Sequence, residues 1–296
     1  MQPTRLVSLL CRPCALTAHQ GRFFSQKVAA ADEIIVDRMD GAHKGIAVFS
    51  MNRPAAKNAF GMSFVQSFSD HLKVISHSQD IRILIIRSLV PGVFCAGADL
   101  KERAGMTDNE VVKFVNRLRK LTSDVEKLPM PVIAAIDGAA LGGGFELALA
   151  CDLRIASSNA KLGLVESKLA IIPGAGGTQR LPRIVGTTLA KELLFTGRIF
   201  DGKRAREYGI VNHAPEQNDS KDAAFQRAMK LAEEILPAGP LALNLIKTAV
   251  DAGIQTSIES GCKIEEACYA HVVPTKDRLE GLLAFKEKRA PRFTGE

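Results

Sequence analysis

Apolar and polar positions alternate along the chain in a way that divides most of it into strands and helices. Four apolar runs have the length and the β-branched content of strands, at residues 34–36, 46–51, 81–87 and 132–136. Two helices are predicted between these runs, with apolar stripes formed by Phe64, Val65, Phe68, Leu72 and Ile75 and by Val111, Phe114, Val115, Leu118 and Val125. Thr107 and Glu110 have the spacing of a capping box, which predicts where the second helix begins.

Strands that alternate with helices predict an α/β fold in which parallel strands are joined by right-handed crossovers. The strands are almost continuously apolar, as expected when both faces of a sheet are covered. After Pro173 the pattern becomes mainly helical, with helices predicted over 187–195, 219–236, 240–252, 258–270 and 276–288. We therefore expect an α/β core over residues 31–225 and a helical C-terminal region over 226–296.

The first thirty residues differ in composition from the rest of the chain. They contain Arg5, Arg12, Arg22 and Lys27, several hydroxyl residues and no acid before Asp32, which is typical of a mitochondrial transit peptide. The stretch 22–25 (RFFS) resembles a matrix-protease cleavage site, and the alternative is a disordered tail. Without these four cations the formal net charge falls from +7 to +3, so the basic balance indicates a nucleic-acid partner only weakly.

The bulk composition excludes some classes of protein. The chain has 296 residues, of which 46% are hydrophobic, enough for one large domain or two small ones. No apolar run reaches the length of about 18 residues that a membrane-spanning helix needs. The six cysteines are scattered, and the CxxC spacing of Cys11 and Cys14 has no second pair to complete a metal site. We expect free thiols in a reducing compartment and no metal.

Three segments of small residues stand out, each near an apolar run. They are residues 94–100 (FCAGADL), 142–147 (GGGFEL) and 162–166 (LGLVE), the last followed by a glycine-rich stretch over 172–178. Small residues leave backbone N–H groups free to approach a ligand, and a helix that starts there adds further unpaired N–H groups. Two such loops facing one point would form an oxyanion hole for an enolate. Taken singly, each loop is better explained as a tight turn or a phosphate loop, although neither matches the dinucleotide or P-loop fingerprints.

Two acids lie in otherwise apolar surroundings, twenty positions apart. Glu146 is the only polar residue of the segment 145–150, and Glu166 lies between apolar residues on both sides. A buried carboxylate must be paired, hydrogen-bonded or functional. Two that share one water can each tune the protonation of the other. The alternative is a pair of structural acids held by salt bridges or caps.

These motifs together resemble the enoyl-CoA hydratase (crotonase) family over about residues 33–296. The AGAD motif at 96–99, the glycines before Glu146, the position of Glu166 and the stretch 173–181 (PGAGGTQRL) match in order and spacing. The resemblance implies a crotonase spiral of ββα units, with a helical C-terminal region that forms trimers, which pair into homo-hexamers. It also implies acyl-CoA substrates and an enzyme without a cofactor, since coenzyme A is part of the substrate.

The resemblance implies a role for each matching residue. The backbone N–H groups of Ala98 and Gly143 would bind the thioester oxygen. Glu166 would donate a proton to the α-carbon, and Glu146 would help to deprotonate the attacking water. Further matching positions would contact coenzyme A, the last two often from a neighbouring subunit: Ala96, Asp99, Leu100, Lys101, Tyr269 and Lys288.

The implied reaction is the syn addition of water across the 2,3 double bond of an enoyl-CoA in the mitochondrial matrix. The stretches 94–104, 168–174 and 274–289 resemble the branch that converts 3-methylglutaconyl-CoA to 3-hydroxy-3-methylglutaryl-CoA in leucine degradation. The alternative within the family is a general short-chain hydratase of fatty-acid oxidation. Arg103 is a candidate partner for the second carboxylate of 3-methylglutaconyl-CoA, and the alternative is a solvated arginine on the loop before Thr107.

A hypothesis of a different class is an AU-rich RNA-binding protein. Some members of the same branch bind such RNA through a lysine-rich helix. The corresponding segment here, 62–80, has only Lys73, His71 and His77 as basic residues, whereas RNA binding needs several cations along the phosphates. The helix over 107–127 is more basic, but such charges are also typical of a solvated face.

Overall fold

A computed structural model describes residues 32–296, and the predicted transit peptide with Cys11 and Cys14 lies outside this range. One sheet has the strand order β1-β2-β3-β5-β7. Its strands are β1 (Ile34–Arg38), β2 (Ile46–Met51), β3 (Ile83–Ser88), β5 (Val132–Ile136) and β7 (Leu153–Ala156). From β2 to β7 every pair is parallel, as predicted, whereas β1 pairs antiparallel with β2. Only the short 3₁₀ turn η1 (Gly41–His43) joins β1 to β2, and a crossover needs a longer connection.

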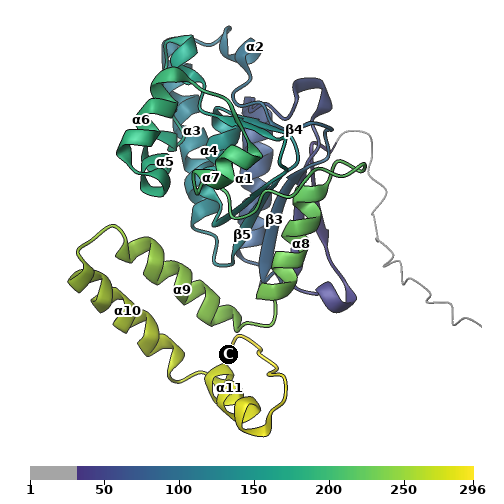
Figure 1. Cartoon of the computed structure of the whole chain (residues 1–296), viewed down its shortest axis with the longest axis vertical. Coiled ribbons are helices and arrows are strands. Elements are labelled where there is room, and N and C mark those ends of the chain that lie inside the picture. Colours follow the sequence, from purple (N-terminus) through teal and green to yellow (C-terminus); the bar gives the residue numbers. More distant parts are fainter. Residues whose placement is uncertain (1–31) are drawn as a thin grey trace, which may run out of the picture.

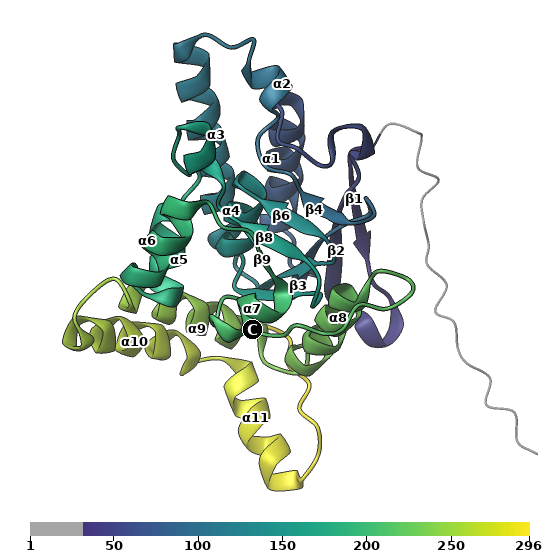
Figure 2. The same cartoon turned by 45° about the horizontal axis from the view of Figure 1, so that its top comes forward.

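A second, smaller sheet has the order β4-β6-β8-β9 and was not predicted. Its strands are β4 (Val93–Cys95), β6 (Ala139–Leu141), β8 (Lys161–Gly163) and β9 (Phe200–Asp201). The first three are parallel, and β9 runs antiparallel to β8. Consecutive strands enter the two sheets alternately, as β3 and β4, then β5 and β6, then β7 and β8. The chain therefore winds as a spiral, and each turn adds a strand to both sheets (Figure 2).

Helices cover the sheets on both sides. The larger ones are α1 (Met62–Ser76), α3 (Asp108–Glu126), α4 (Gly143–Ala150), α5 (Gly177–Val185), α6 (Thr187–Thr196) and α8 (Ala223–Ile235), and the short ones are η2 (Pro54–Ala56), α2 (Leu100–Arg103), η3 (Glu166–Leu169) and α7 (Gly202–Glu207). The predicted capping box is confirmed, because Thr107 and Glu110 each accept from the other's backbone N–H. The predicted start of α8 at residue 219 is wrong: Lys221 has φ +57°, and the helix begins only after Asp222.

Alternate residues of the first sheet enter two different apolar layers. Ile83 and Ile85 of β3 pack with Ala224, Ala228 and Ala232 of α8. The alanines have small side chains, so the helix lies close to the strands. On the opposite face, Leu84 and Ile86 join the larger core with the phenylalanines of α1 and the apolar stripes of α3 and α4. Both faces are therefore buried, which explains the continuous apolar strands.

The last three helices form an arm that extends from the core (Figure 1). They are α9 (Pro240–Gly253), α10 (Ile258–Val272) and α11 (Lys276–Glu287), as predicted to within two residues at each end. Neither α9 nor α10 buries a single residue in this one chain. Large apolar side chains on the arm are exposed, among them Ile246, Val250, Ile254, Ile258, Leu279, Leu282 and Phe285. A 2.8 Å ion pair from Lys247 to Asp152 ties α9 to the core.

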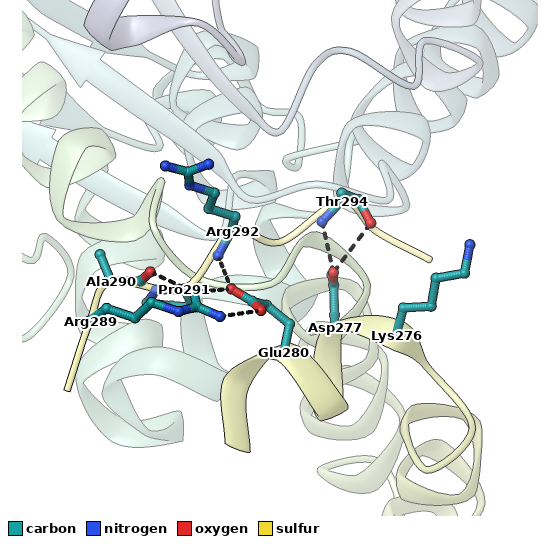
Figure 3. A pocket seen from close by; sticks show the side chains of 8 residues that line it. All are labelled: Lys276, Asp277, Glu280, Arg289, Ala290, Pro291, Arg292 and Thr294. Atoms are coloured by element: carbon teal, nitrogen blue, oxygen red, sulfur yellow. Dashed lines mark hydrogen bonds and ion pairs between the residues drawn. The ribbon is translucent and has the colours of Figure 1, made fainter. Parts of the chain in front are cut away.

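The end of the chain folds back along α11, around an open hollow (Figure 3). Asp277 accepts hydrogen bonds from the N–H groups of Thr294 and Gly295, at 2.7 and 2.9 Å. Glu280 pairs with Arg289 at 2.6 Å and also accepts from the N–H of Arg292. These contacts fix the tail on its own arm, far along the chain from the predicted catalytic residues. Within residues 32–296, no helix is long and apolar enough to cross a membrane.

Candidate active site

The predicted functional loops follow three neighbouring strands of the second sheet. Residues 96–99 follow β4, Gly142 and Gly143 follow β6, and residues 164–166 follow β8. These strands are adjacent and parallel, so their carboxyl ends lie at the same edge of the sheet (Figure 2). The fold thereby brings together motifs that lie up to seventy residues apart in the sequence.

The loops after β4 and β6 touch each other. Gly97 has φ +96°, and a Cβ there would lie 2.8 Å from Leu141 O and 3.3 Å from Gly143 N, so only glycine fits. A Cβ on Gly143 would lie 3.8 Å from Ala98 N. Gly143 is the first residue of α4, where an N–H has no partner within the helix. Among the described residues Ala98 N–H has no hydrogen-bond acceptor either. Two unpaired donors therefore lie close together, as an oxyanion hole requires.

A cavity of about 530 Å³ opens beside these two N–H groups. Its floor includes Ala98 and Gly143, and both Glu146 and Glu166 line it. The remaining wall is largely apolar and contains Phe114, Val115, Leu118, Val165, Leu169, Ile171, Ile172 and Pro173, together with two cations, Arg103 and Arg119. An apolar cavity with a few convergent polar groups is the usual form of a small-molecule site.

Glu146 is held as an acceptor inside the protein. It lies on the first turn of α4 and is only 2% exposed. Its Oε1 accepts two hydrogen bonds of 2.8 Å, from the N–H groups of Ala175 and Gly177. Burial raises the pKa of Glu146, while these two N–H groups and the charges of Arg180 and Arg119 act in the opposite direction. The environment thus supplies donors for the ionised form.

Glu166 lines the same cavity but has a different environment. It begins η3 and is 8% exposed. Its Oε2 is buried and has no hydrogen-bond partner among residues 32–296. Burial raises the pKa of Glu166 to about 7, and the Glu146 carboxylate adds to this while the residue's own N–H opposes it. At neutral pH this carboxyl can therefore carry a proton or release it.

The structure brings some of the other predicted site residues to the cavity and leaves others away from it. Ala96 and Leu100 line the cavity. Asp99 instead caps α2, accepting from the N–H groups of Lys101 and Glu102, and its other oxygen contacts Arg53 at 3.3 Å. Lys101 is exposed on α2 and is not part of the wall. Tyr269 on α10 and Lys288, the C-cap of α11, lie on the C-terminal arm, away from the cavity of the same chain.

Arg103 lies in the wall of the cavity and is partly buried. It is the last residue of the short helix α2, and the loop expected at this position is therefore wrong. The turn forms because Asp99 satisfies the first N–H groups of the helix. Among the described residues the Arg103 guanidinium has no acceptor, whereas Arg119 donates to Gly174 O and to Asn116.

The partners of Glu146 were missed by the sequence analysis. The glycine-rich stretch over 172–178 was noted, but nothing in its spacing indicates which side chain its N–H groups would contact. Ala175 and Gly177 lie 29 and 31 residues from Glu146, and only the fold brings them together. Within residues 32–296 there is no group of three or more His, Cys, Asp or Glu side chains that could hold a metal ion.

The sequence matches the model of one protein family, described as enoyl-CoA hydratase/isomerase, over residues 41–296. The chain belongs to this family. Of solved structures, an enoyl-CoA hydratase from Bacillus anthracis superposes with a TM-score of 0.85 at 45% identity, covering 90% of this chain and 100% of the other. The predicted α/β fold of the crotonase type is therefore confirmed, and so is the expectation of an enzyme of this family.

Two kinds of curated relative are similar to the chain to nearly the same degree. The human mitochondrial methylglutaconyl-CoA hydratase is 52% identical over 275 residues, which is 93% of this chain and 81% of the relative. The mouse mitochondrial enoyl-CoA hydratase domain-containing protein 2 is 54% identical over 272 residues, which is 92% of each. Overall identity therefore does not choose between these two, and the substrate must be argued from the cavity.

Proposed function

We propose that this protein hydrates 2-enoyl-CoA thioesters and that its preferred substrate is 3-methylglutaconyl-CoA, giving 3-hydroxy-3-methylglutaryl-CoA. The observation that carries the proposal is one cavity that contains two unpaired N–H donors and two buried carboxylates in unlike environments. This set matches the needs of water addition to a conjugated thioester. Addition of water changes no net oxidation state and the N–H donors stabilise the developing charge, so we expect no metal or redox cofactor. Coenzyme A enters as part of the substrate.

In the proposed mechanism the thioester oxygen binds to the N–H groups of Ala98 and Gly143. When water adds at the β-carbon, electrons move through the conjugated system and negative charge develops on this oxygen. Fixed N–H dipoles stabilise that charge more than they stabilise the neutral carbonyl, so they lower the barrier. Loss of one such donor typically costs about 3–4 kcal/mol of barrier.

The two glutamates divide the proton transfers. Glu146, whose Oε1 accepts from two N–H groups, is suited to remain a carboxylate and to take a proton from the attacking water. Glu166, whose pKa is raised to about 7, is suited to donate a proton to the α-carbon. Both acids line the one cavity, so both proton transfers can act on the same bound thioester.

Arg103 supports 3-methylglutaconyl-CoA as the substrate. The far end of this acyl chain has a second carboxylate, which is costly to bury without a partner. Arg103 lines the cavity, and its guanidinium has no hydrogen-bond or ion-pair partner within residues 32–296. It can therefore grip a carboxylate with two parallel hydrogen bonds. The alternative is a general short-chain hydratase, in which Arg103 faces solvent at the cavity mouth.

A substrate panel tests the proposal directly. We expect the purified protein to hydrate 3-methylglutaconyl-CoA with a kcat/KM at least tenfold above that for crotonyl-CoA, which has no second carboxylate. The loss of absorbance of the conjugated double bond gives both rates. Equal rates would assign the protein as a general short-chain hydratase, and no turnover of either thioester would overturn the proposed function.

We further propose that the chain forms homo-hexamers, as dimers of trimers. Support comes from the arm, whose apolar side chains on α9–α11 are exposed in the single chain. Tyr269 and Lys288 would then contact coenzyme A in a neighbouring subunit, since they lie away from the cavity of their own chain. Light scattering of the purified protein should give six times the subunit mass.

The mitochondrial matrix is the proposed location. The first thirty residues have the composition of a transit peptide, and both kinds of curated relative are mitochondrial proteins by name. We expect the mature protein to start between residues 25 and 32. Intact-mass measurement on protein from isolated mitochondria tests this, and a full-length N-terminus would contradict it.

A further inference from the structure

The loop over 174–177, which donates to Glu146, is itself bound through its carbonyl groups by side chains outside the loop. Ala175 N–H and Gly177 N–H point at the carboxylate, and the carbonyl groups of the same loop point the other way. In a trans peptide the N–H and the preceding C=O are antiparallel, so fixing the oxygen also fixes the direction of the N–H. Contacts to Gly174 O therefore set the direction of Ala175 N–H, and contacts to Ala175 O hold the peptide that lies between the two peptides that donate to Glu146.

Helix α3 supplies two of these contacts. Nε of Arg119 donates to Gly174 O at 2.9 Å, on the peptide whose N–H group reaches Glu146. The Thr122 hydroxyl lies 2.7 Å from Ala175 O and 2.9 Å from Arg119 O, and we assign its one hydrogen to the shorter contact. Thr122 is fully buried. It is not part of the cavity wall, so it has no direct access to a substrate.

Arg180 on α5 supplies the third contact. Its Nη1 donates to Ala175 O at 3.0 Å. The other face of the guanidinium is paired with Glu126 of α3, through bonds of 3.0 and 2.7 Å. Gly176 has φ +105°, and a Cβ at this position would lie 2.1 Å from Nη1, so a side chain would displace Arg180. Glycine at position 176 therefore leaves the space that the Arg180 guanidinium occupies.

We infer that Arg119, Thr122 and Arg180, which we call the carbonyl clamp, are positioning residues that hold the 174–177 loop so that Glu146 remains an oriented carboxylate. The inference rests on the proposed function, because it assigns the base of that reaction. Glu126 is not part of the clamp but supports it, since it orients Arg180.

The clamp acts through both geometry and charge. Arg119 binds Gly174 O and so polarises the peptide that carries Ala175 N–H, which strengthens this N–H as a donor to Glu146. Thr122 and Arg180 bind the next carbonyl and act by fixing the position of the loop. Arg180 and Arg119 also lower the pKa of Glu146 against the effect of burial. Loss of the clamp should leave the apolar cavity and its oxyanion donors in place. It should then impair the proton transfer rather than the binding of the thioester.

The test uses paired variants that avoid the cavity wall. Arg180→Met removes the charge and the donors, and Arg180→Lys restores the charge without the planar guanidinium that binds Ala175 O and Glu126 together. Thr122→Val removes the hydroxyl at nearly constant volume, and Thr122→Ser retains it. Arg183→Met, on the exposed side of the same helix α5, is the matched control. For each variant we would measure kcat, KM, the pH dependence of kcat/KM and the melting temperature, on the enoyl-CoA that the wild type hydrates fastest.

We expect kcat to fall about 10–100-fold in Arg180→Met and about 3–10-fold in Thr122→Val, with KM changed less than about twofold. The pKa of Glu146 should rise, so the acid limb of the profile should move to higher pH. Arg180→Lys and Thr122→Ser should each recover much of the loss, and Arg183→Met should match the wild type.

The inference is overturned if both Arg180→Met and Thr122→Val keep kcat and the acid limb of the wild type, even if they melt at lower temperature. If Arg180→Met does not fold, the difference between Thr122→Val and Thr122→Ser decides alone. An inactive wild type would instead remove the proposed function, and this outcome is distinct from an active enzyme that ignores the clamp.

Discussion

The Glu146 and Glu166 sides of the cavity present the same functional group in two different environments. Glu146 has two backbone donors on one oxygen, with two arginines behind them. Glu166 has a buried oxygen with no partner among the described residues, and its pKa is raised to about 7. The residue type is identical, so the surroundings alone separate a carboxylate that accepts protons from an acid that can donate them.

The two sides also differ in the kind of contact that surrounds each glutamate. On the Glu146 side, α3, α5 and the 174–177 loop are joined by hydrogen bonds and an ion pair. On the Glu166 side, the wall consists mainly of apolar side chains such as Leu169 and Ile172, both of which are exposed in part. An apolar wall raises a carboxyl pKa without any specific contact, whereas keeping a buried carboxylate ionised requires several.

The largest expected effect comes from removing either acid. Glu146→Gln and Glu166→Gln should each lower kcat by about 10²–10⁴-fold, because each removes one proton-transfer group. Gln has nearly the same shape, so the fold should be retained and circular dichroism should match the wild type. A near-wild-type kcat in either variant, measured with crotonyl-CoA or 3-methylglutaconyl-CoA, would exclude that residue from the mechanism.

Sequence patterns predicted most strands of the first sheet and most of the main helices, but not the second sheet that positions the site. The apolar runs predicted β2 and β5, and the spacing of Thr107 and Glu110 predicted the capping box of α3, since both signals are local in the sequence. The strands of the second sheet were missed because two or three residues are too few to show a period. Yet these strands bring Ala98, Gly143 and Glu166 to one edge.

The environments of the two glutamates were likewise beyond sequence reasoning. Apolar neighbours indicated that both are buried, and this holds at 2% and 8% exposure. The donors to Glu146 lie about thirty residues away, and their direction depends on φ at Gly176 and on Arg180. Similarly, no spacing indicates that Asp99 caps α2, or that Tyr269 lies on an arm away from its own cavity.

The second expected effect is selective for one substrate. Arg103→Met should lower kcat/KM for 3-methylglutaconyl-CoA by about one to two orders of magnitude, since a charge-assisted hydrogen bond contributes about 1.5–3 kcal/mol. Crotonyl-CoA should be nearly unaffected, and Arg117→Met, on the exposed side of α3, serves as the control. An equal loss on both substrates would show that Arg103 serves coenzyme A or α2 instead.

The smallest expected effect is on stability, and it separates the two glutamates without any substrate. The raised pKa of Glu166, about 7 against an ordinary 4.5, means that the unfolded chain releases this proton first as pH rises. The native state therefore loses stability between pH 4.5 and 7, and the loss then stays constant. Glu166→Gln removes this loss. The free energy of unfolding of the variant, relative to the wild type, should therefore be on the order of 1–2 kcal/mol higher at pH 8 than at pH 5, a figure reduced for solvent that enters the cavity.

Glu146→Gln is the matched variant for this measurement. Burial raises the pKa of Glu146 too, but its two N–H donors and the arginines oppose the effect, so its pH-dependent gain should be smaller. Urea unfolding at pH 5 and pH 8, at one fixed protein concentration, gives both differences; the concentration is fixed because association would itself change the apparent stability. If the two variants gain equally, the unlike environments of the glutamates do not separate their protonation, and the assignment of Glu166 as the acid loses its physical basis.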